Sequence, residues 1–526
     1  MLNIGLGWAA FGIVILVLIV LNYIIVKYYS DKHESEAITT IIAVIGLTLT
    51  LLCVMIIPVD ILNVSTMSNQ QGNWTIDPTD ISSRNFNVKM LYYDSNIYLS
   101  IYSLLLVLYG AVAVVSLILI PFAYFFYEEY DENETIGSRI YAGCKYTIFF
   151  IVFTIVLLVV GAFVRPGSSK PVDNQNVQDW IKQEVLNQNA IESSLLFTFA
   201  CLSFLGFCVW ATYTAYGLSA FPIGLIKGKR KISDDKSHIN EDLYKTREKS
   251  KFYSSKFASG KSLSAKEEST LSLLKHKERA LERRSSRLDS ADKGIKKIFV
   301  IFRPFAFIFG FIFLLFSLLI VISIVLSIID KISASVCGSA CGFLTTYPKL
   351  KNPFDILLIK LAPYFPADYF ILGFVIFYIF ASTLSGIVRI GIRFLWVHMY
   401  DFQYRKTFPQ GLLVACVLLM LSNLCLNMQI INLAPRYVMY GTQVFLNTTS
   451  LEVLPCSIEA PPDLCIMSQI GVLTSRIQLG TSFFGIIYYY ATWAFVGTFL
   501  IGLVVSIIRK PQTNISSAYD DEDDYA

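Results

Sequence analysis

The chain has 526 residues, of which 55% are hydrophobic and only 16% are Asp, Glu, Lys or Arg. Soluble domains carry about 25% charged residues, so this composition excludes a soluble globular enzyme and predicts a polytopic membrane protein. The net charge of +4 indicates no nucleic-acid partner, and ten cysteines in so long a chain exclude a disulfide-rich scaffold.

Long apolar stretches recur along the whole chain. Crossing a bilayer about 30 Å thick takes roughly 20 helical residues, and nine stretches are long enough to do so. We therefore expect an all-α fold with about nine transmembrane helices. The third stretch is expected to tilt or to break at Pro121, because proline removes a backbone donor. The predicted spans are residues 5–27, 37–58, 98–127, 144–164, 194–220, 297–328, 368–395, 408–432 and 478–508.

Charge divides the chain into four regions: five spans in residues 1–226, a basic helical module in 227–297, four spans in 298–508 and an acidic tail in 509–526. The basic module contains 21 of the 43 Lys and Arg residues. Because the cytosolic side of a membrane collects Lys and Arg, we expect this module in the cytosol. The amino terminus then lies on the other side and the carboxyl terminus lies in the cytosol. Without the module the basic residues divide almost evenly, so the orientation depends on it.

Within the basic module, leucines at helical spacing predict an amphipathic helix over residues 264–289, which could form one arm of a helical hairpin. They are Leu271, Leu274, Leu281 and Leu288. The module could pack only on itself, bind a partner, or contact anionic lipid head groups. The acidic run Asp520–Asp524 is typical of a solvated segment, and a role in binding sorting adaptors stays open.

Modification sites give a second indication of orientation. The glycosylation sequons at Asn63, Asn73 and Asn447 all fall on the non-cytosolic side of this topology, whereas those at Asn133 and Asn514 fall on the cytosolic side. A Pro-rich turn in the same loop as Asn447 is bracketed by two cysteines, which an oxidising compartment would allow to pair. These disulfide candidates are Cys456 and Cys465, and free thiols remain the alternative.

Motifs for catalysis and for metal binding are incomplete. His33 and Glu34 resemble the start of a zinc-protease helix, but Ala37 stands where the second histidine is needed. Lys261 follows a glycine as in a phosphate-binding loop, yet Ser255 replaces the required first glycine. We expect no enzyme, no metal site and no ATP hydrolysis by this chain.

Polar residues inside apolar spans are the better functional clues. We expect Asp60 at the outward membrane interface, with a position facing a cavity as the alternative. We expect Arg389 and Arg393 on one helical face, and Asn423 and Asn427 on a shared face where they could hydrogen-bond to other helices. Residues 352–366 are too short to cross a bilayer. We expect them to form an outward interfacial or re-entrant helix bounded by prolines.

Two strings carry a family resemblance: TYTAYGLSAFPIGLIKG at 212–228 and LAPRYVMYGTQ at 433–443. They resemble the signature of the limb-region and lipocalin-receptor family of nine-span membrane proteins. Supporting strings run from the second span to the ninth, so the resemblance covers nearly the whole chain. They are PVDI at 58–61, IPFAYFFYEE at 120–129, LVVGAFV at 158–164 and WAFVGTFLIGLV at 493–504.

The resemblance implies a lysosomal membrane glycoprotein that reaches the lysosome through the endoplasmic reticulum, with a lumenal amino terminus and a cytosolic carboxyl terminus. It also implies a role in exporting cobalamin to the cytosol together with a subfamily-D ABC half-transporter, which this chain would escort and which would hydrolyse ATP. Cobalamin, with its cobalt, is then cargo, and no covalently bound cofactor is expected. The alternative from the same family is an endocytic receptor at the plasma membrane for a lipocalin-type carrier, which would engage endocytic adaptors.

Overall fold

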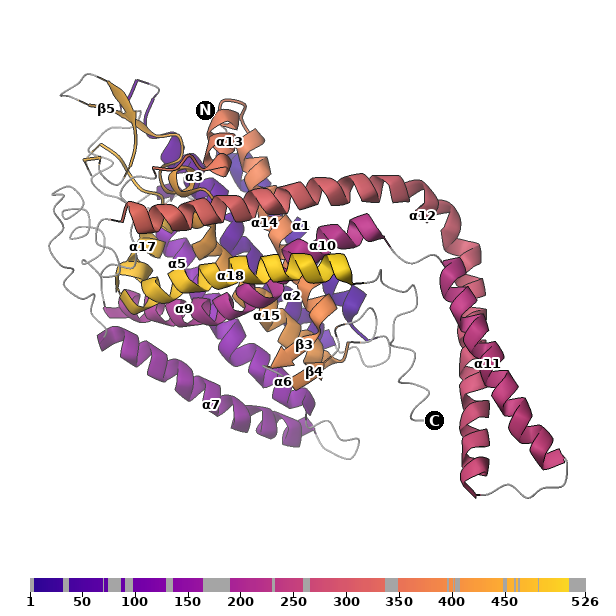
Figure 1. Ribbon diagram of the computed structural model, residues 1–526. Coiled ribbons are helices and arrows are strands. Elements are labelled where there is room, and N and C mark those ends of the chain that lie inside the picture. The colour runs from indigo at the N-terminus through magenta and orange to yellow at the C-terminus, as the bar shows by residue number, and fades with distance from the viewer. Residues whose placement is uncertain are drawn as a thin grey trace. The chain divides into compact units, whose positions relative to one another are not determined.

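The computed structural model describes most of the chain (Figure 1). It covers residues 4–31, 37–69, 71–73, 87–89, 98–128, 136–163, 190–228, 232–258, 265–335, 349–394, 397–400, 402, 407–447, 452–457, 460–461, 464–480 and 482–509. His33, Asn133 and Asn514 lie outside the described residues.

The chain divides into two compact units, residues 1–219 with 316–503 and residues 220–315 with 504–526. Helices account for nearly all described elements, and the expected helical membrane fold is confirmed. The helices are α1 (Ile4–Tyr29), α2 (Ala37–Met55), α3 (Ile57–Ser65), α5 (Ile101–Val114), η1 (Val115–Leu119), α6 (Ile120–Glu128), α7 (Ile136–Phe163), α9 (Ala190–Val209), η3 (Trp210–Thr214), α10 (Ala215–Lys227), α11 (Ile232–Ala258), α12 (Ala265–Ser333), α13 (Pro353–Leu361), α14 (Ala367–Ile390), α15 (Pro409–Leu433), α16 (Pro435–Tyr440), α17 (Gln469–Gly480) and α18 (Ser482–Ile508).

Three short antiparallel hairpins join the helices. They pair β1 (Asn87–Lys89) with β2 (Tyr98–Ser100), β3 (Ile392–Phe394) with β4 (Val397–Tyr400), and β5 (Val444–Leu446) with β6 (Val453–Pro455). In the second hairpin Phe394 pairs with Val397, and the register shifts between Ile392 and Arg393. Among the described residues, these three hairpins are the only β-sheets, and the all-α prediction did not include them.

Nine helices or helix runs of the described chain are long and apolar enough to cross a membrane, as predicted. Their burial separates a centre from a periphery. In α15, 83% of the most apolar window is buried by other helices, whereas the figures for α7 and α1 are 11% and 17%. Since α15 packs against α2, α6 and α9, it is the central helix of the first unit. The side chains exposed on α1 and α7 suit contact with lipid.

Three glycines bring helix backbones of the first unit into direct contact. A Cβ on Gly206 would lie 2.3 Å from the carbonyl oxygen of Leu421, and one on Gly217 would lie 1.9 Å from that of Ser382. On Gly386 it would lie 2.1 Å from the carbonyl oxygen of Tyr213. Lipid is as apolar as leucine, so membrane helices associate through such close packing of small residues. The glycines thus bring the fifth span, made of α9, η3 and α10, against α14 and α15.

The third and fifth spans each contain a π-helical turn, η1 and η3. In the third span the helix continues through Pro121 after η1, so the chain does not break there. A π turn of this kind absorbs local irregularity of the hydrogen-bond ladder inside a helix. In the fifth span η3 carries Tyr213 and Thr214, at the level where α14 approaches.

Some predicted helix ends were wrong. The helix of the fourth span begins at Ile136, eight residues before the predicted start, and the segment before the ninth span forms a separate helix, α17. Helix α14 ends at Ile390, because Gly391 takes a φ of +76° that other residues rarely adopt. Arg393 therefore belongs to β3 and does not share a helical face with Arg389.

The second unit contains a long antiparallel hairpin of α11 and the first part of α12 (Figure 1). Its arms face each other through half-buried or buried side chains at heptad-like spacing, Ile239, Leu243, Thr246, Ser250 and Tyr253 on α11 and Leu271, Leu274 and Leu281 on α12. Arg247 of α11 pairs with Glu278 and Glu282 of α12, which fixes the register of the arms. The leucine pattern therefore marks one arm of a helical hairpin, as expected.

The close contact at Gly386 gives a stability test. We expect Gly386→Ala to lower the apparent Tm of the detergent-solubilised chain, because an added methyl group cannot be placed against the Tyr213 carbonyl without shifting a helix, which costs about 1–3 kcal/mol. The matched control is Gly373→Ala in the same helix, where a Cβ meets nothing within 4 Å. It should leave Tm unchanged or raise it, because alanine favours helix. Equal effects of the two substitutions would contradict the packing argument.

Candidate functional site

Polar side chains of three spans meet beside the central helix α15. The Thr214 hydroxyl of η3 lies 2.9 Å from the Thr383 hydroxyl of α14 and 3.0 Å from the Ser422 hydroxyl of α15. All three side chains are at most 1% exposed. Close approach at the glycines makes this cluster possible, because short hydroxyl side chains can bridge backbones only over short distances.

A tyrosine extends this arrangement toward the end of α14. The Tyr213 hydroxyl donates to the backbone oxygen of Gly391 and accepts from the backbone N–H of Arg393 (3.1 Å). A second contact joins α14 to α12, where the Tyr378 hydroxyl lies 2.5 Å from the Ser317 hydroxyl. Ser317 in turn donates to the backbone carbonyl of Leu218 in the fifth span. The family string at 212–228 thus supplies groups that tie the fifth span to the sixth and seventh.

The two predicted asparagines of α15 have different surroundings. The Asn423 amide donates to Thr50 of α2 over 3.5 Å, so the expected bond to another helix exists. Asn427, one turn further along, is fully buried, and both polar atoms of its side chain lack a hydrogen-bond partner in the described chain. A buried amide without a partner is energetically costly, so Asn427 is the least satisfied polar group of this helix.

Three buried carboxylates of the first unit hold its short helices, and we call this region, around Asp60, Asp355, Asp368 and Tyr437, the cap. Asp60 accepts from the backbone N–H of Ile470 (2.9 Å) at the start of α17, and Asp355 accepts from the N–H of Tyr437 (3.0 Å) at the start of α16. Asp368 accepts from the Tyr437 hydroxyl (2.5 Å). Carboxylates at helix N-termini satisfy free N–H groups and match the helix dipole. Asp60 is 1% exposed, so other parts of the protein cover its side chain, and its position at the membrane interface stays a prediction.

Gln443, the last residue of the string at 433–443, joins these helices to the following loop. Its side-chain nitrogen donates to the backbone oxygens of Val64 (2.9 Å) and Ile466, and its side-chain oxygen accepts from the Ile466 N–H (2.8 Å). Arg476 of α17 also forms an ion pair with Glu192 of α9. The cap is therefore held in place by hydrogen bonds and an ion pair between segments that are distant in the sequence.

Burial shifts the pKa values of two groups in this cap. Loss of water raises the pKa of Asp355 to about 6, although N–H donation from Tyr437 and Arg436 opposes the shift. Burial, followed by the contact with the Asp368 carboxylate, raises the pKa of the Tyr437 hydroxyl far above its usual range. Tyr437 thus stays a hydroxyl donor, whereas Asp355 changes its charge between neutral and mildly acidic pH.

The structure brings most predicted modification residues to this same end. Gly72 packs against the backbone of Leu446, so Asn73 and Asn447 follow neighbouring chain segments. A disulfide joins Cys456 to Cys465, and the N–H of Cys456 donates to the Gln443 backbone. Asn63 lies half-buried inside α3, where Ser65 of its sequon accepts from the Thr442 N–H. The geometry therefore favours Asn73 and Asn447 over Asn63 as glycan acceptors.

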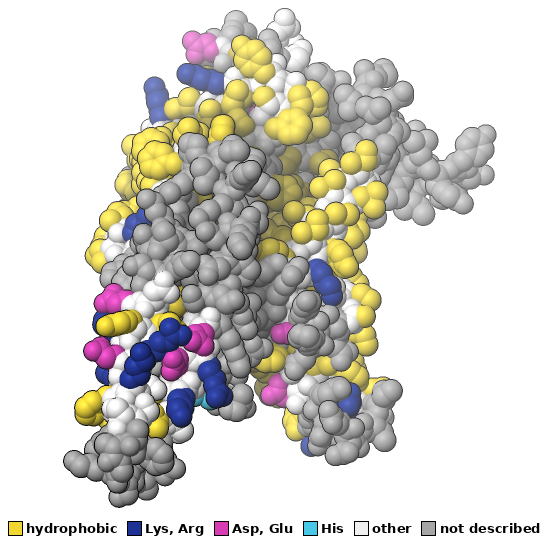
Figure 2. Space-filling model, turned by 90° about the vertical axis from the view of Figure 1, so that its right-hand side faces the viewer, with side chains coloured by type: hydrophobic (Ala, Val, Ile, Leu, Met, Phe, Trp, Pro, Cys, Tyr) yellow, Lys and Arg dark blue, Asp and Glu magenta, His cyan; other side chains and the backbone are white. Residues whose placement is uncertain are grey.

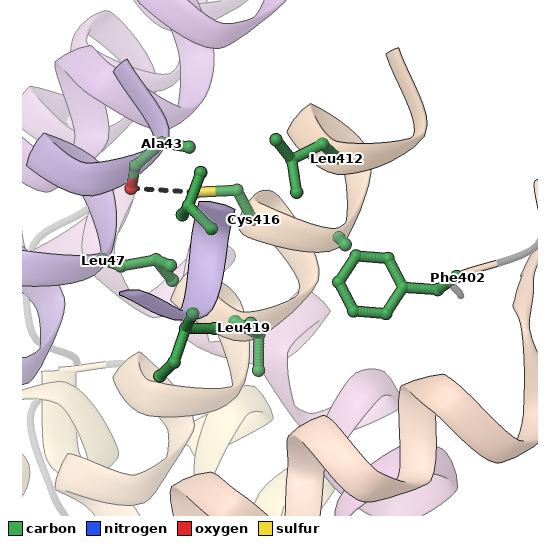
Figure 3. Close-up of a pocket in the computed structure, with 9 residues that line it drawn as sticks. Ala43, Leu47, Phe402, Leu412, Cys416 and Leu419 are labelled. Carbon is green, nitrogen blue, oxygen red and sulfur yellow. Dashed lines mark hydrogen bonds between the residues drawn. The ribbon is translucent and has the colours of Figure 1, made fainter. Parts of the chain in front are cut away.

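Figure 3 shows a small pocket lined by α1, α2, α15 and Phe402. Its volume is only about 10 Å³, and the Cys416 thiol donates to the Ala43 backbone oxygen at its wall (3.5 Å). The lining is apolar throughout: Ile25, Val26, Ala43, Leu47, Phe402, Leu412, Ala415, Cys416 and Leu419. Ligand pockets usually measure about 300–1,000 Å³ and place a few polar groups, so this pocket does not suit a large polar ligand.

Among the described residues, no three His, Cys, Asp or Glu side chains are grouped so that they could hold a metal ion. The buried hydroxyl and carboxylate groups described above hold helices together through hydrogen bonds. Asp355, Asp368 and Gln443 were not predicted from the sequence to hold the cap. A local sequence pattern could have singled out Asp355, because Asn352 and Pro353 mark a helix start and Asp355 lies in its first turn. Its partners on α16 could not be predicted in this way, since they are about 80 residues away.

The raised pKa of Asp355 predicts a pH-dependent stability. Its pKa is about 6 in the folded chain and about 3.9 when unfolded, so the folded state binds the proton more strongly and gains stability as pH falls from 7 toward 5. The gain is on the order of 1 kcal/mol. Asp355→Asn should reduce this gain, measured as the difference in Tm between pH 7 and pH 5 for the chain in detergent. An unchanged difference in the variant would contradict the assignment.

Known proteins place the chain in a family. The model of the LMBR1-like membrane protein family matches residues 8–300. The chain is 71% identical to the "Probable lysosomal cobalamin transporter" of Dictyostelium discoideum, over 100% of both chains. It is 33% identical to the protein of the same name in Nematostella vectensis, over 98% of this chain and 97% of that one.

The "Lysosomal cobalamin transport escort protein LMBD1" of Gallus gallus is 32% identical over 98% of this chain and 96% of that one. No solved structure shows a significant match. Full-length identity of this degree, together with the match to the family model, leads to one conclusion: this chain belongs to the LMBR1-like family of membrane proteins.

Proposed function

We propose that this chain is a multi-pass lysosomal membrane protein that serves the export of cobalamin from the lysosome to the cytosol. The observation that carries the proposal is the 71% identity over the full length to a protein named a probable lysosomal cobalamin transporter. At this identity the packing residues, buried polar groups and loops are expected to be shared. The relatives are named as transporters and as an escort protein, which agrees with a role other than catalysis.

We further propose that the chain acts by accompanying a subfamily-D ABC half-transporter, and that the partner supplies ATP hydrolysis. The relative from Gallus gallus is named an escort protein. Two membrane surfaces of this chain suit contact with partner helices. Large apolar side chains are widely exposed on α7, including Tyr141 and Phe149, and on α12, including Phe305. Such surfaces are covered by lipid or by other membrane helices.

The proposed orientation has a lumenal amino terminus, a cytosolic hairpin of α11 and α12, and a cytosolic carboxyl terminus. The density of Lys and Arg in residues 227–297 supports it. So does the clustering at one end of the disulfide, Asn73 and Asn447, since glycans and disulfides belong to the lumenal side. Transit through the endoplasmic reticulum follows from this topology, and endocytic adaptors would meet the cytosolic loops, the hairpin among them, and the tail.

Glycan mapping tests this orientation. We expect Asn73→Gln and Asn447→Gln each to remove one glycan, seen as a smaller mobility shift on glycosidase treatment of the expressed chain. The matched controls are Asn133→Gln and Asn514→Gln, whose sequons lie on the predicted cytosolic side and should leave the shift unchanged. A shift lost with either control would place the opposite face in the lumen.

Gene deletion tests the role itself. In cells without the chain, we expect labelled cobalamin to accumulate in lysosomes and the ABC half-transporter to be absent from lysosomal membranes, and expression of the wild-type chain should restore both. Normal cobalamin release with a correctly located half-transporter would refute the proposal. Loss of uptake of a secreted lipocalin-type carrier at the cell surface, with intact cobalamin release, would instead support the endocytic-receptor alternative.

A further inference from the structure

The cytosolic hairpin has a cationic end. Residues 249–258 of α11 and 269–277 of α12 contain five lysines and no carboxylate. Lys249, Lys251, Lys275 and Lys277 are exposed, and none of them has an ion-pair partner among the described residues. In Figure 2, which faces the hairpin, dark blue Lys and Arg side chains gather toward its end. We use "cationic end" for these two segments.

The register of the hairpin places these lysines at similar levels along the two arms. Arg247 pairs with Glu278 and with Glu282, so in antiparallel arms Lys251 lies at about the level of Lys275 and Lys249 at about the level of Lys277. Nearer the base, the cations Lys245 and Arg247 are already paired with glutamates. Like charges on neighbouring arms repel one another, and an anionic occupant would lower that cost.

The same unit contains an anionic segment that begins close to the base of the hairpin. Three backbone carbonyls at the end of α18, those of Ser506, Ile507 and Arg509, accept hydrogen bonds from the Lys227 ammonium at distances of 2.5–2.8 Å. Helix α11 starts five residues after Lys227. The tail after residue 509 therefore leaves the protein beside the base of the hairpin and on the same side of the membrane.

The tail has the length and the negative charge that contact with the hairpin requires. Residues 227–297 carry 21 basic and 11 acidic side chains, a net charge of +10, whereas residues 511–526 carry five acidic side chains and no basic one. Lys249 lies about 26 Å along α11 from its start, at about 1.5 Å per helical residue. From residue 509 to Asp520–Asp524 the chain can extend at most about 36–50 Å, at about 3.3 Å per residue. This exceeds the distance along α11 by about 10–24 Å, which is available to cover the separation between residue 509 and the start of α11.

We propose that the acidic run Asp520–Asp524 docks on the cationic end of the hairpin as an intramolecular ligand. Because the acidic run belongs to the same chain as the lysines, a connection of about 15 residues gives it a high effective concentration next to them. Exposed aromatic side chains on α11, Tyr244 and Phe252, offer contacts for the tail tyrosines Tyr519 and Tyr525. In this state the tail masks the surface that anionic lipids or an acidic partner would otherwise contact.

Zero-length carbodiimide cross-linking tests the docking, because it joins carboxylates to amines that touch. For the full chain in phosphatidylcholine nanodiscs at low salt, mass spectrometry should find intramolecular links from residues 520–524 to Lys249, Lys251, Lys275 or Lys277. The double variant Lys249→Glu and Lys251→Glu should lower the yield of tail links to the hairpin by roughly threefold or more. These lysines are exposed, so the variant should fold, and an unchanged Tm verifies this.

A charge swap and a matched control complete the test. Adding Asp521→Lys and Asp523→Lys to the double variant should restore the links, whereas Lys351→Glu, an exposed lysine of the other unit, should not change them. Links that do not respond to Lys249→Glu and Lys251→Glu would overturn the proposal.

Lipid provides the competing occupant. Neutralising the tail, with Asp520, Asp521, Asp523 and Asp524 changed to Asn and Glu522 to Gln, should increase binding of the nanodisc-held chain to vesicles of phosphatidylcholine and phosphatidylserine. Equal binding by the wild-type and neutralised chains would show that the cationic end is not masked by the tail and would overturn the proposal. This readout does not depend on cobalamin transport, so its failure leaves the proposed function unaffected.

Discussion

Inside a bilayer no water can satisfy polar groups, so every bend, cap and helix contact has to supply its own hydrogen-bond partners. The central helix α15 meets this constraint through backbone contact. Where Gly206 lies against the Leu421 carbonyl and Gly386 against the Tyr213 carbonyl, the backbones come close enough for Thr214, Thr383 and Ser422 to bond one another. A methyl group at either glycine would separate the helices and leave those hydroxyls without partners.

The same constraint explains the buried carboxylates of the cap. Short helices such as α16 and α17 begin with free N–H groups, and water is largely excluded from them by α3, α13 and α14. Asp60 and Asp355 reach those N–H groups from other parts of the sequence. Because the folded chain binds the Asp355 proton more strongly than the unfolded chain does, the cap gains stability as the pH falls through about 6.

The two units satisfy their charged groups in different ways. In the first unit the buried carboxylates accept backbone N–H groups, and a disulfide closes the neighbouring loop. In the second unit the hairpin keeps exposed lysines at its surface, where they are available to a ligand. Such a division suits a protein that combines a stable helical scaffold with a hairpin that makes changeable contacts.

Much of the architecture could be predicted from the sequence. Nine apolar stretches give nine helices because the bilayer thickness fixes their length, and the leucines at 271, 274 and 281 mark a hairpin arm because helical periodicity is local. Asn423 was also recognised as a group that bonds across helices. These inferences need only neighbouring residues and the known properties of lipid.

Only the tertiary structure decided how distant residues pair. Asp60 accepts a hydrogen bond from the start of a helix 410 residues away, and nothing near Asp60 in the sequence indicates Ile470 as its partner. Likewise Arg393 leaves the helix because Gly391 turns the chain, and the contact of Gly217 with Ser382 depends on how two spans cross. Periodicity and composition determine which segments are helices and which faces are apolar, whereas the partners of buried polar groups depend on helix packing that acts over hundreds of residues.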